Sequence, residues 1–545
     1  MTPSSSGPHR SRRTGLRLAA LFTTFAATVW LPAAHAQGSP AARAAAITPS
    51  PTAATTWTTS TLPGLDALWA GFDKAGVKSS EVALLAQPLT EGAPALAAHN
   101  AHLPVTMAST TKVMTTLAGL QLLPSTFRWT TRAWLGGPLA DGTLQGDLIL
   151  VGGGDATLSS KALVGWFTQL HKKGLTQVQG RIVLDQSLYR LTDKDHANTP
   201  VPEASNPHHA WPDAFVVDES RFSLQLTQSA EGAVQARFDP PLAQVALVNQ
   251  LSGAGRCSAM ARFEPADPAA PAATASVAVT PVGTATPTPA PAARVVLSGQ
   301  WHAGCKTPVT MEAAPGRALS SALVAGAWLA AGGTLTGAVV HREPAAPAPK
   351  TKRTRKIPSP YPGKPWDTLR SAPLPELVRS INKTSNNLMA RSLLLSIAPG
   401  FSPTTSTLQL ARQRMGQWFA KLGMAHAAPH IDNGSGLAHN EQASAQQMVQ
   451  LLQQAWAAPK VQKVFLASLP IAGADGTLGN RFKNSTAQRQ AFLKTGTLTG
   501  VRSLAGYVRG KSGQMIAVTI IVNSPKATAA VPTMDRFIEW VVDNG

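Results

Sequence analysis

A Ser-x-x-Lys pattern joins Ser109 to Lys112 and offers a hydroxyl nucleophile next to an amine. Apolar residues at helical spacing follow over 113–120, so we expect a helix to begin near Ser109. Lys112 then lies one turn beyond Ser109 on the same face of that helix. Serine at its ordinary pKa is a poor nucleophile, and an amine takes its proton only if burial or a second cation lowers the amine's own pKa. The spacing therefore predicts nucleophilic catalysis at Ser109.

A second match, Ser380 with Lys383, shows that this pattern alone is weakly specific. A Ser-x-Asn element follows at Ser385 and Asn387, too close to Lys383 to meet it across a cleft but 385 − 109 = 276 positions beyond Ser109. A third element, Lys-Thr-Gly-Thr over residues 494–497, lies in a run with strand character ahead of a predicted hairpin. The order of the three elements favours Ser109 as the nucleophile.

These elements, in this order, resemble the fingerprint of the penicillin-recognising serine acyl enzymes. Within that group the chain resembles the D-alanyl-D-alanine carboxypeptidase/endopeptidase family of class C low-molecular-mass penicillin-binding proteins, peptidase family S13. The closer resemblance rests on the long stretch between the first two elements and on segments 146–155 and 432–437. It covers residues 57 to 545. Asn433 replaces a family aspartate, and Ala438-His439 replace Ser-Arg, so the preference between peptide substrates is in doubt.

The resemblance implies a role for each site residue. Ser109 would be acylated and Lys112 would be its base. Ser385 would relay a proton to the leaving amine, and Asn387 would hold Lys112 and the substrate amide. The remaining implied roles are binding of the substrate carboxylate by Lys494 with Thr495, Gly496 and Thr497, an oxyanion hole from the backbone N–H groups of Ser109 and Thr497, and substrate contact by Asp185 of the inserted domain.

The function implied is that of a serine-type D-Ala-D-Ala carboxypeptidase, a DD-endopeptidase, or both. It would act on peptidoglycan stem peptides through a Ser109 acyl-enzyme, and β-lactam antibiotics would be covalent inhibitors. This chemistry needs no metal or other cofactor. A β-lactamase and a non-catalytic peptidoglycan-binding protein are the alternatives; the long spacing argues against the first, and the intact elements argue against the second. A homodimer stays open.

The first 36 residues have the order of a cleaved signal peptide. Four arginines precede an apolar run over 18–31, and Ala34-His35-Ala36 offers a cleavage site. The run of about 14 residues is shorter than the ~20 needed to cross a bilayer, so we expect a cleaved signal and no anchor in the mature protein. We expect export to the periplasm, with the Sec route favoured over the twin-arginine route.

Charge first suggests a nucleic-acid partner, because 48 Lys and Arg against 28 Asp and Glu give a net charge of +20. Four of these charges leave with the signal peptide, which lowers the net charge to +16. Five more gather over 350–356 in a linker. Export and this clustering argue against nucleic acid. The two cysteines, Cys257 and Cys305, are expected to form a disulfide in an oxidising compartment.

The organisation predicted is an α/β (α+β) penicillin-binding fold with a central antiparallel sheet flanked by helices. Apolar spacing predicts helices over 65–75, 374–381 and 534–542, a strand over 82–86, and a hairpin formed by strands 503–508 and 515–523. Residues 37–56 form a disordered leader, and the catalytic domain is split between 57–130 and 355–545. Residues 131–342 form a mainly β insertion with a low-complexity loop at 264–294, and 343–365 form a basic, Pro-rich linker. Gly434-Ser435-Gly436 is interpreted as a turn, because it lacks the first glycine of a nucleophile elbow.

Overall fold

The computed structural model of the chain describes residues 56, 58, 62–197, 210–253, 255–265, 293–306, 309–311, 316–342, 361–400, 402, 404–424 and 428–545. The predicted signal peptide, nearly all of the leader and the basic run at 350–356 lie outside these residues. Within the described part of the chain, the helices are too short or too polar to traverse a lipid bilayer.

A five-stranded antiparallel sheet joins the two ends of the chain, in the order β2-β1-β22-β21-β20. The strand predicted near 82–86 and the hairpin predicted over 503–523 both occur in it. Because β1 lies beside β22, the N-terminal segment of the fold completes a sheet built mainly from C-terminal residues. Its strands are β1 (Val82–Pro88), β2 (Ala97–His99), β20 (Ala491–Leu498), β21 (Val501–Arg509) and β22 (Met515–Asn523).

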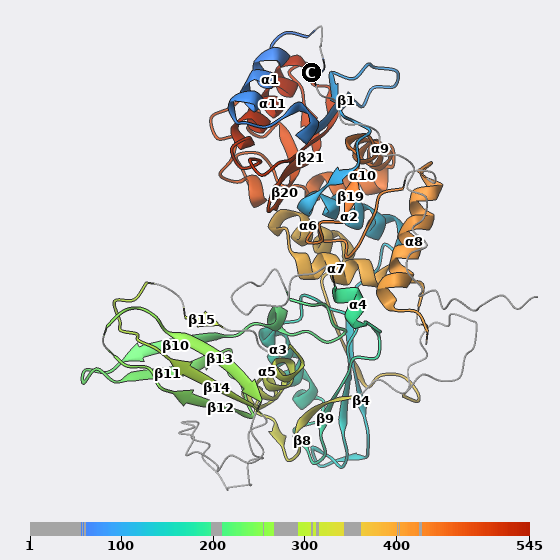
Figure 1. Cartoon of the computed structure of the whole chain (residues 1–545). Helices are drawn as coiled ribbons and strands as arrows, with labels where there is room; N and C mark the ends of the chain where they lie inside the picture. The colour runs from blue at the N-terminus through green and yellow to red at the C-terminus, as the bar shows by residue number, and fades with distance from the viewer. Residues whose placement is uncertain are drawn as a thin grey trace, which may run out of the picture. The chain divides into compact units, whose positions relative to one another are not determined.

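Alternation along these strands fills two hydrophobic cores, one on each face of the sheet. Leu84 packs with the helices α1 (Leu65–Lys74) and α11 (Val531–Asn544), which lie side by side on one face (Figure 1). Leu85, its neighbour, packs into the other core with the helices that follow the Ser109 turn. These are α2 (Thr111–Leu122), α8 (Thr407–Lys421), α9 (Ala445–Trp456) and α10 (Pro459–Ser468).

Two further helices carry or follow the second sequence element. The helix α6 (Leu374–Thr384) ends at Ser385, whose backbone is left-handed with φ of 58°. The next helix, α7 (Asn387–Ser396), begins at once, and the Asn386 side chain caps it by accepting from the N–H of Met389. The Ser-x-Asn element is therefore the sharp corner between two helices. Two short strands, β3 (Val105–Thr106) and β19 (Gln442–Ala443), pair nearby.

The stretch between the first two elements contains several sheets. One has the order β17-β9-β7-β4-β18, and residues of β4 and β7 on one of its faces line a pocket. The others have the orders β16-β8-β6-β5, β12-β14-β13-β15 and β10-β11. Their bounds are β4 (Thr130–Leu135), β5 (Leu139–Ala140), β6 (Thr143–Leu144), β7 (Leu148–Val151), β8 (Gln177–Val178), β9 (Ile182–Asp185), β10 (Ser223–Gln228), β11 (Val234–Asp239), β12 (Val245–Asn249), β13 (Met260–Pro265), β14 (Ala293–Ser298), β15 (Thr310–Met311), β16 (Thr334–Leu335), β17 (Val339–Arg342) and β18 (Asp367–Arg370).

Two helices that were not predicted accompany the strands of this mainly β stretch. They are α3 (Ser160–Lys172) and α5 (Gly316–Ala330), which pack against each other in the core of the inserted sheets (Figure 1). A stripe from Leu163 to Leu170 follows a Ser159 cap, so the sequence carried a signal for α3. A shorter helix, α4 (Asp193–His196), also lies here.

Two predicted boundaries also move. The loop expected at 264–294 has strands at both ends, because β13 and β14 pair with Glu264 opposite Arg294, and these two side chains form an ion pair. Residues 266–292 lie outside the described part. The strand β18 follows position 355 but pairs with β4 of the inserted sheet. Cys257 and Cys305 are joined by a disulfide.

Packing of α2 gives a first prediction, which compares two leucines of different burial. Leu117 in α2 is 1% exposed and Leu329 in α5 is 51% exposed. We expect Leu117→Ala to lower the free energy of unfolding by about 2–5 kcal/mol, because it leaves a cavity. Leu329→Ala should change it by no more than about 0.5 kcal/mol. Denaturant unfolding of both variants measures the difference, and equal losses would contradict the core described here.

Candidate active site

Lys112 is the centre of the polar cluster around Ser109. Ser109 lies in a 3₁₀ turn, Ala108–Thr110, directly before α2, as the spacing predicted. The Lys112 side chain is fully buried, and its Nζ donates to Ser109 Oγ at 3.0 Å and to Asn387 Oδ1 at 2.5 Å. It also donates to the carbonyl oxygen of Ser435. Burial first, and then the charge of Lys494, lowers the pKa of Lys112 well below its ordinary value, which is what a base for Ser109 requires.

Lys494 occupies a second buried position beside Ser385. Its Nζ donates to Ser385 Oγ and to the carbonyl oxygen of Thr495, both at 2.8 Å. Burial lowers the pKa of Lys494 to about 7. The Thr495 hydroxyl donates to Thr477 Oγ1 at 2.8 Å, and the Thr497 side chain is exposed. The structure thus brings the Lys-Thr-Gly element to the Ser-x-Asn corner.

The competing pattern at Ser380 has no such geometry. Lys383 forms an ion pair with Asp475 at 2.6 Å and donates to the carbonyl oxygen of Leu469. The Ser380 hydroxyl donates to the sulfur of Met389, at 3.6 Å. Lys383 therefore serves as a structural cation that ties α6 to the chain around Asp475.

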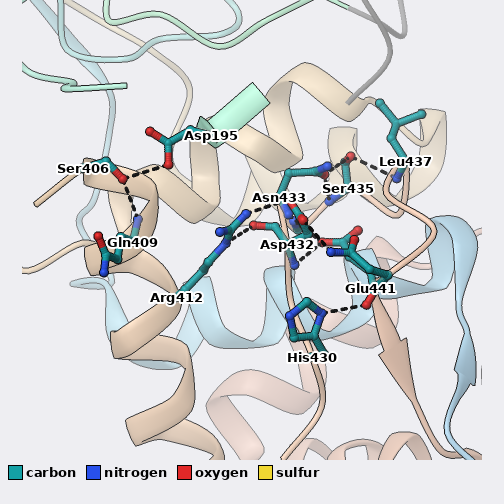
Figure 2. A network of polar contacts seen from close by, with 12 residues as sticks. Asp195, Ser406, Gln409, Arg412, His430, Asp432, Asn433, Ser435, Leu437 and Glu441 are labelled. Carbon is teal, nitrogen blue, oxygen red and sulfur yellow. Dashed lines mark hydrogen bonds and ion pairs between the residues drawn. The ribbon is translucent and has the colours of Figure 1, made fainter. Parts of the chain in front are cut away.

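Glu441 organises the loop that contains Asp432, Asn433 and Ser435 (Figure 2). This loop presents the Ser435 carbonyl to Lys112. The Glu441 carboxylate accepts from the backbone N–H groups of Asp432, Asn433, Gly434 and Gly436 at 2.5–3.1 Å. Burial raises the pKa of Glu441, while these N–H donors favour the charged form.

Other contacts brace the same loop from outside. Arg412 forms an ion pair with Asp432 at 2.6 Å, and Asn433 accepts from Ser435 (Figure 2). The predicted turn is therefore a closely hydrogen-bonded loop. The contacts between Asn433 and Ser435 lie inside this loop.

Two glycines permit the loop and strand β20 to approach the nucleophile turn closely. A Cβ on Gly436, which has φ of +82°, would lie 1.9 Å from the carbonyl oxygen of Ala108. A Cβ on Gly496 would lie 2.0 Å from Ser503 Oγ and 2.9 Å from the Met107 carbonyl oxygen. Thr497 follows Gly496, so the two proposed oxyanion-hole residues lie on elements in contact, β20 and the Ser109 turn.

Asp185 is the predicted site residue that the structure does not bring to this cluster. It is fully buried at the end of β9, where it pairs with Arg342 at 3.1 Å and accepts from the Tyr361 hydroxyl at 2.7 Å. These contacts give Asp185 a structural role within the inserted sheet.

Two acidic residues near the site were missed by sequence reasoning. Glu441 follows the Gly-rich segment that drew attention, but a lone glutamate carries no local pattern. Glu219 of the insertion accepts from Asn386 Nδ2 at 2.7 Å and pairs with Arg221 at 2.8 Å. Glu219 connects the insertion to the Ser-x-Asn corner. Glu219 and Asn386 are 167 positions apart, so no local sequence pattern could predict this contact.

Comparison of the sequence with known protein families identifies the family to which a chain with this cluster belongs. Residues 71–541 match the D-Ala-D-Ala carboxypeptidase 3 (S13) family. The chain belongs to that family. This S13 chain is 34% identical over 170 residues to the D-alanyl-D-alanine carboxypeptidase of an Actinomadura species and 29% identical over 156 residues to the D-alanyl-D-alanine carboxypeptidase DacB of Haemophilus influenzae. These alignments cover 30% and 28% of the chain, and 31% and 32% of the relatives, so it spans about a third of the length of each.

The fold of the S13 chain is also found in a solved structure. Penicillin binding protein 4 (dacB) of Haemophilus influenzae aligns over 88% of this chain and 100% of its own, with a TM-score of 0.62 and 19% sequence identity. A second structure of that protein, complexed with a β-lactam, has a TM-score of 0.61 and 20% identity and aligns over 87% of this chain and 99% of its own. The predicted penicillin-binding fold is therefore confirmed.

The close approach at Gly436 gives a second prediction. Gly436→Ala places a Cβ against the Ala108 carbonyl, so we expect it to lower the free energy of unfolding by roughly 1–3 kcal/mol through overpacking, in addition to the cost of its left-handed backbone. Gly513→Ala is the matched control, because Gly513 has φ of +86° and nothing within 4 Å of its Cβ position. Equal losses in denaturant unfolding would show that the contact with Ala108 contributes nothing.

Proposed function

We propose that this S13 chain is a serine-type D-Ala-D-Ala carboxypeptidase that acts through a Ser109 acyl-enzyme. The observation that carries the proposal is the buried Lys112 amine, held between Ser109 Oγ, Asn387 Oδ1 and the Ser435 carbonyl. Family membership and the carboxypeptidase names of the relatives support the same reaction class.

The first step is attack by Ser109 Oγ on the carbonyl carbon of the substrate peptide bond. Lys112 accepts the hydroxyl proton, and the oxyanion accepts hydrogen bonds from the backbone N–H groups of Ser109 and Thr497. The C–N bond then breaks. Ser385, which accepts from Lys494, passes its proton to the departing D-alanine amine and regains one from Lys112, so that Lys112 is neutral again.

In the second step water hydrolyses the ester and restores Ser109. Lys112 takes a proton from the water as its oxygen attacks the ester carbonyl carbon, and returns that proton to Ser109 Oγ when the ester C–O bond breaks. The same two steps cleave a cross-link when the departing amine belongs to a neighbouring stem peptide, so DD-endopeptidase activity is part of the proposal. A β-lactam enters by the first step, and its ring-opened ester remains on Ser109.

Lys494, Thr495, Gly496 and Thr497 provide the binding site for the substrate's terminal carboxylate. We infer that the substrate is the stem peptide of peptidoglycan and that the chain is exported to the periplasm after cleavage at residue 36. The division into a split catalytic domain and an insertion belongs to the same proposal.

Ser109→Ala tests the nucleophile. We expect the variant to lose both D-alanine release from a stem pentapeptide and labelling by a fluorescent penicillin, because no hydroxyl remains to form the ester. Activity should fall by at least about a thousandfold. Peptide mapping of labelled wild-type protein should place the adduct on Ser109.

Ser380→Ala is the matched control, since it removes the hydroxyl of the competing Ser-x-x-Lys pattern. It should retain labelling and D-alanine release. An adduct that persists in Ser109→Ala would contradict the mechanism.

The charge of Lys494 gives a prediction about pH. Acylation needs the neutral form of Lys112, so its rate rises with pH through the pKa of Lys112. The Lys494 cation helps to lower that pKa. Lys494→Met removes the cation and should therefore raise the pKa of Lys112 and move the acid limb of the acylation rate to higher pH.

Normalised rates of penicillin acylation, measured from about pH 5 to about pH 10, report this shift, because the interval reaches from well below the ordinary lysine pKa to near it. Lys511→Met is the control, because Lys511 is an exposed lysine paired with Asp543. The same acid limb in Lys494→Met and wild type would overturn the electrostatic role of Lys494.

A further inference from the structure

A pocket of about 520 Å³ lies at the C-terminal end of α7, away from the residues assigned to catalysis. Asn387 begins α7, whereas Leu395 and Ser396 near its end line this pocket. At 1.5 Å per residue the two ends of the helix are separated by about 13 Å. None of the residues proposed for catalysis or carboxylate binding is among the described residues that line the pocket.

The floor of the pocket is one face of the inserted sheet. Thr130, Arg132 and Trp134 alternate along β4 and line the pocket, while the intervening Ala133 packs into the core on the other face. Val151, opposite Arg132 on β7, also lines it. The strand therefore presents one set of side chains to the pocket and the other set to the hydrophobic core, so the position of the pocket-facing side chains is fixed.

Three arginines place positive charge at this face. Arg128 and Arg132 line the pocket and are exposed. Arg370 lies opposite Thr130 on β18, and its charge, after burial, lowers the pKa of Arg132. Within the described residues, no carboxylate forms an ion pair with any of the three. Arg128 donates to the carbonyl oxygen of Ser371 at 2.6 Å, which orients it without neutralising it.

The acid on the same sheet face is already paired. Asp185 lies opposite Val151, but Arg342 and the Tyr361 hydroxyl occupy its carboxylate. It therefore does not cancel the charge of Arg132.

Aromatic side chains complete the pocket. Phe127, Trp134 and Tyr189 all line it, so the pocket offers apolar surface beside the cations. Trp134 is 6% exposed and is therefore held firmly in place.

We propose that this pocket is a second, non-catalytic binding site for an oxyanion carried on an apolar or ring-shaped body. Arg128 and Arg132 contact the oxyanion, and the side chains of Phe127, Trp134 and Tyr189 contact the body of the ligand. Guanidinium groups bind carboxylate and phosphate alike. The ligand is thus a carboxylate or a phosphate ester, and the volume suits a molecule of up to drug size.

Calorimetric titration of the full chain with two probes tests the site. Phenyl phosphate offers a ring with a phosphate, and a soluble disaccharide tetrapeptide offers saccharide rings with carboxylates. The tetrapeptide is added to protein first treated with penicillin, so that the catalytic cleft is occupied. We expect at least one probe to bind with a Kd of about 1 mM or tighter. Binding of phenyl phosphate alone supports a phosphate ligand, and binding of the tetrapeptide alone supports a carboxylate ligand.

Two variants test whether the binding occurs in the pocket. Arg128→Gln combined with Arg132→Gln should weaken binding by about tenfold or more, since it removes both charged donors. Arg237→Gln in β11 is the matched control and should bind as wild type does. Each variant should still form the penicillin adduct, which shows that it is folded.

The proposal is overturned if neither probe binds wild-type protein, or if the double arginine variant binds both as wild type does. Phenyl phosphate is titrated without penicillin, so its result stands even if Ser109 forms no adduct. Failure of the pocket and failure of the proposed catalytic function are therefore distinguishable.

Discussion

The amine of Lys112 has to be fully buried and yet hydrogen-bonded, and much of the fold around the site meets that requirement. A buried amine without acceptors is costly, so three oxygen atoms surround it, from Ser109, Asn387 and Ser435. These residues lie on a 3₁₀ turn, at the start of α7 and on a glycine-containing loop. Burial lowers the pKa of Lys112, and the same burial forces the chain to bring these elements together. A reactive base and a closely packed core are thus two results of one constraint.

Supporting residues extend this constraint outward. Glu441 holds the loop of Ser435 through four backbone N–H groups, and Arg412 holds Asp432 of the same loop. At the other side, Lys494 reaches Ser385, and Glu219 of the insertion reaches Asn386. The helix α7 has the Ser-x-Asn corner at its start and the pocket lined by Arg128 and Arg132 at its end. The stretch between the first two sequence elements therefore lies beside both ends of this helix.

The sequence predicted elements well where the side-chain period is regular. The strand and the hairpin of the central sheet, and helices α1, α2, α6 and α11, were all expected from apolar spacing and turn residues. The long helix α5 was missed, because its alanine-rich run is buried on nearly every side and shows little polar contrast. The strand β18 was not predicted, because its partner β4 lies more than 200 positions earlier, and pairing partners leave no local signal.

Within the site, the sequence by itself determined which residue types were available and in what order: a serine with a lysine one turn later, a Ser-x-Asn element and a Lys-Thr-Gly element. Local spacing is enough for this, since it sets which side chains share a helix face. Only the tertiary structure decided that Lys112 reaches Asn387 while Lys383 pairs with Asp475, that Asp185 is taken by Arg342, and that Glu441 lies beneath the Ser435 loop. Those outcomes depend on burial and on contacts between distant segments. Both influence the charge state of each group, and neither can be predicted from the residues next to it in sequence.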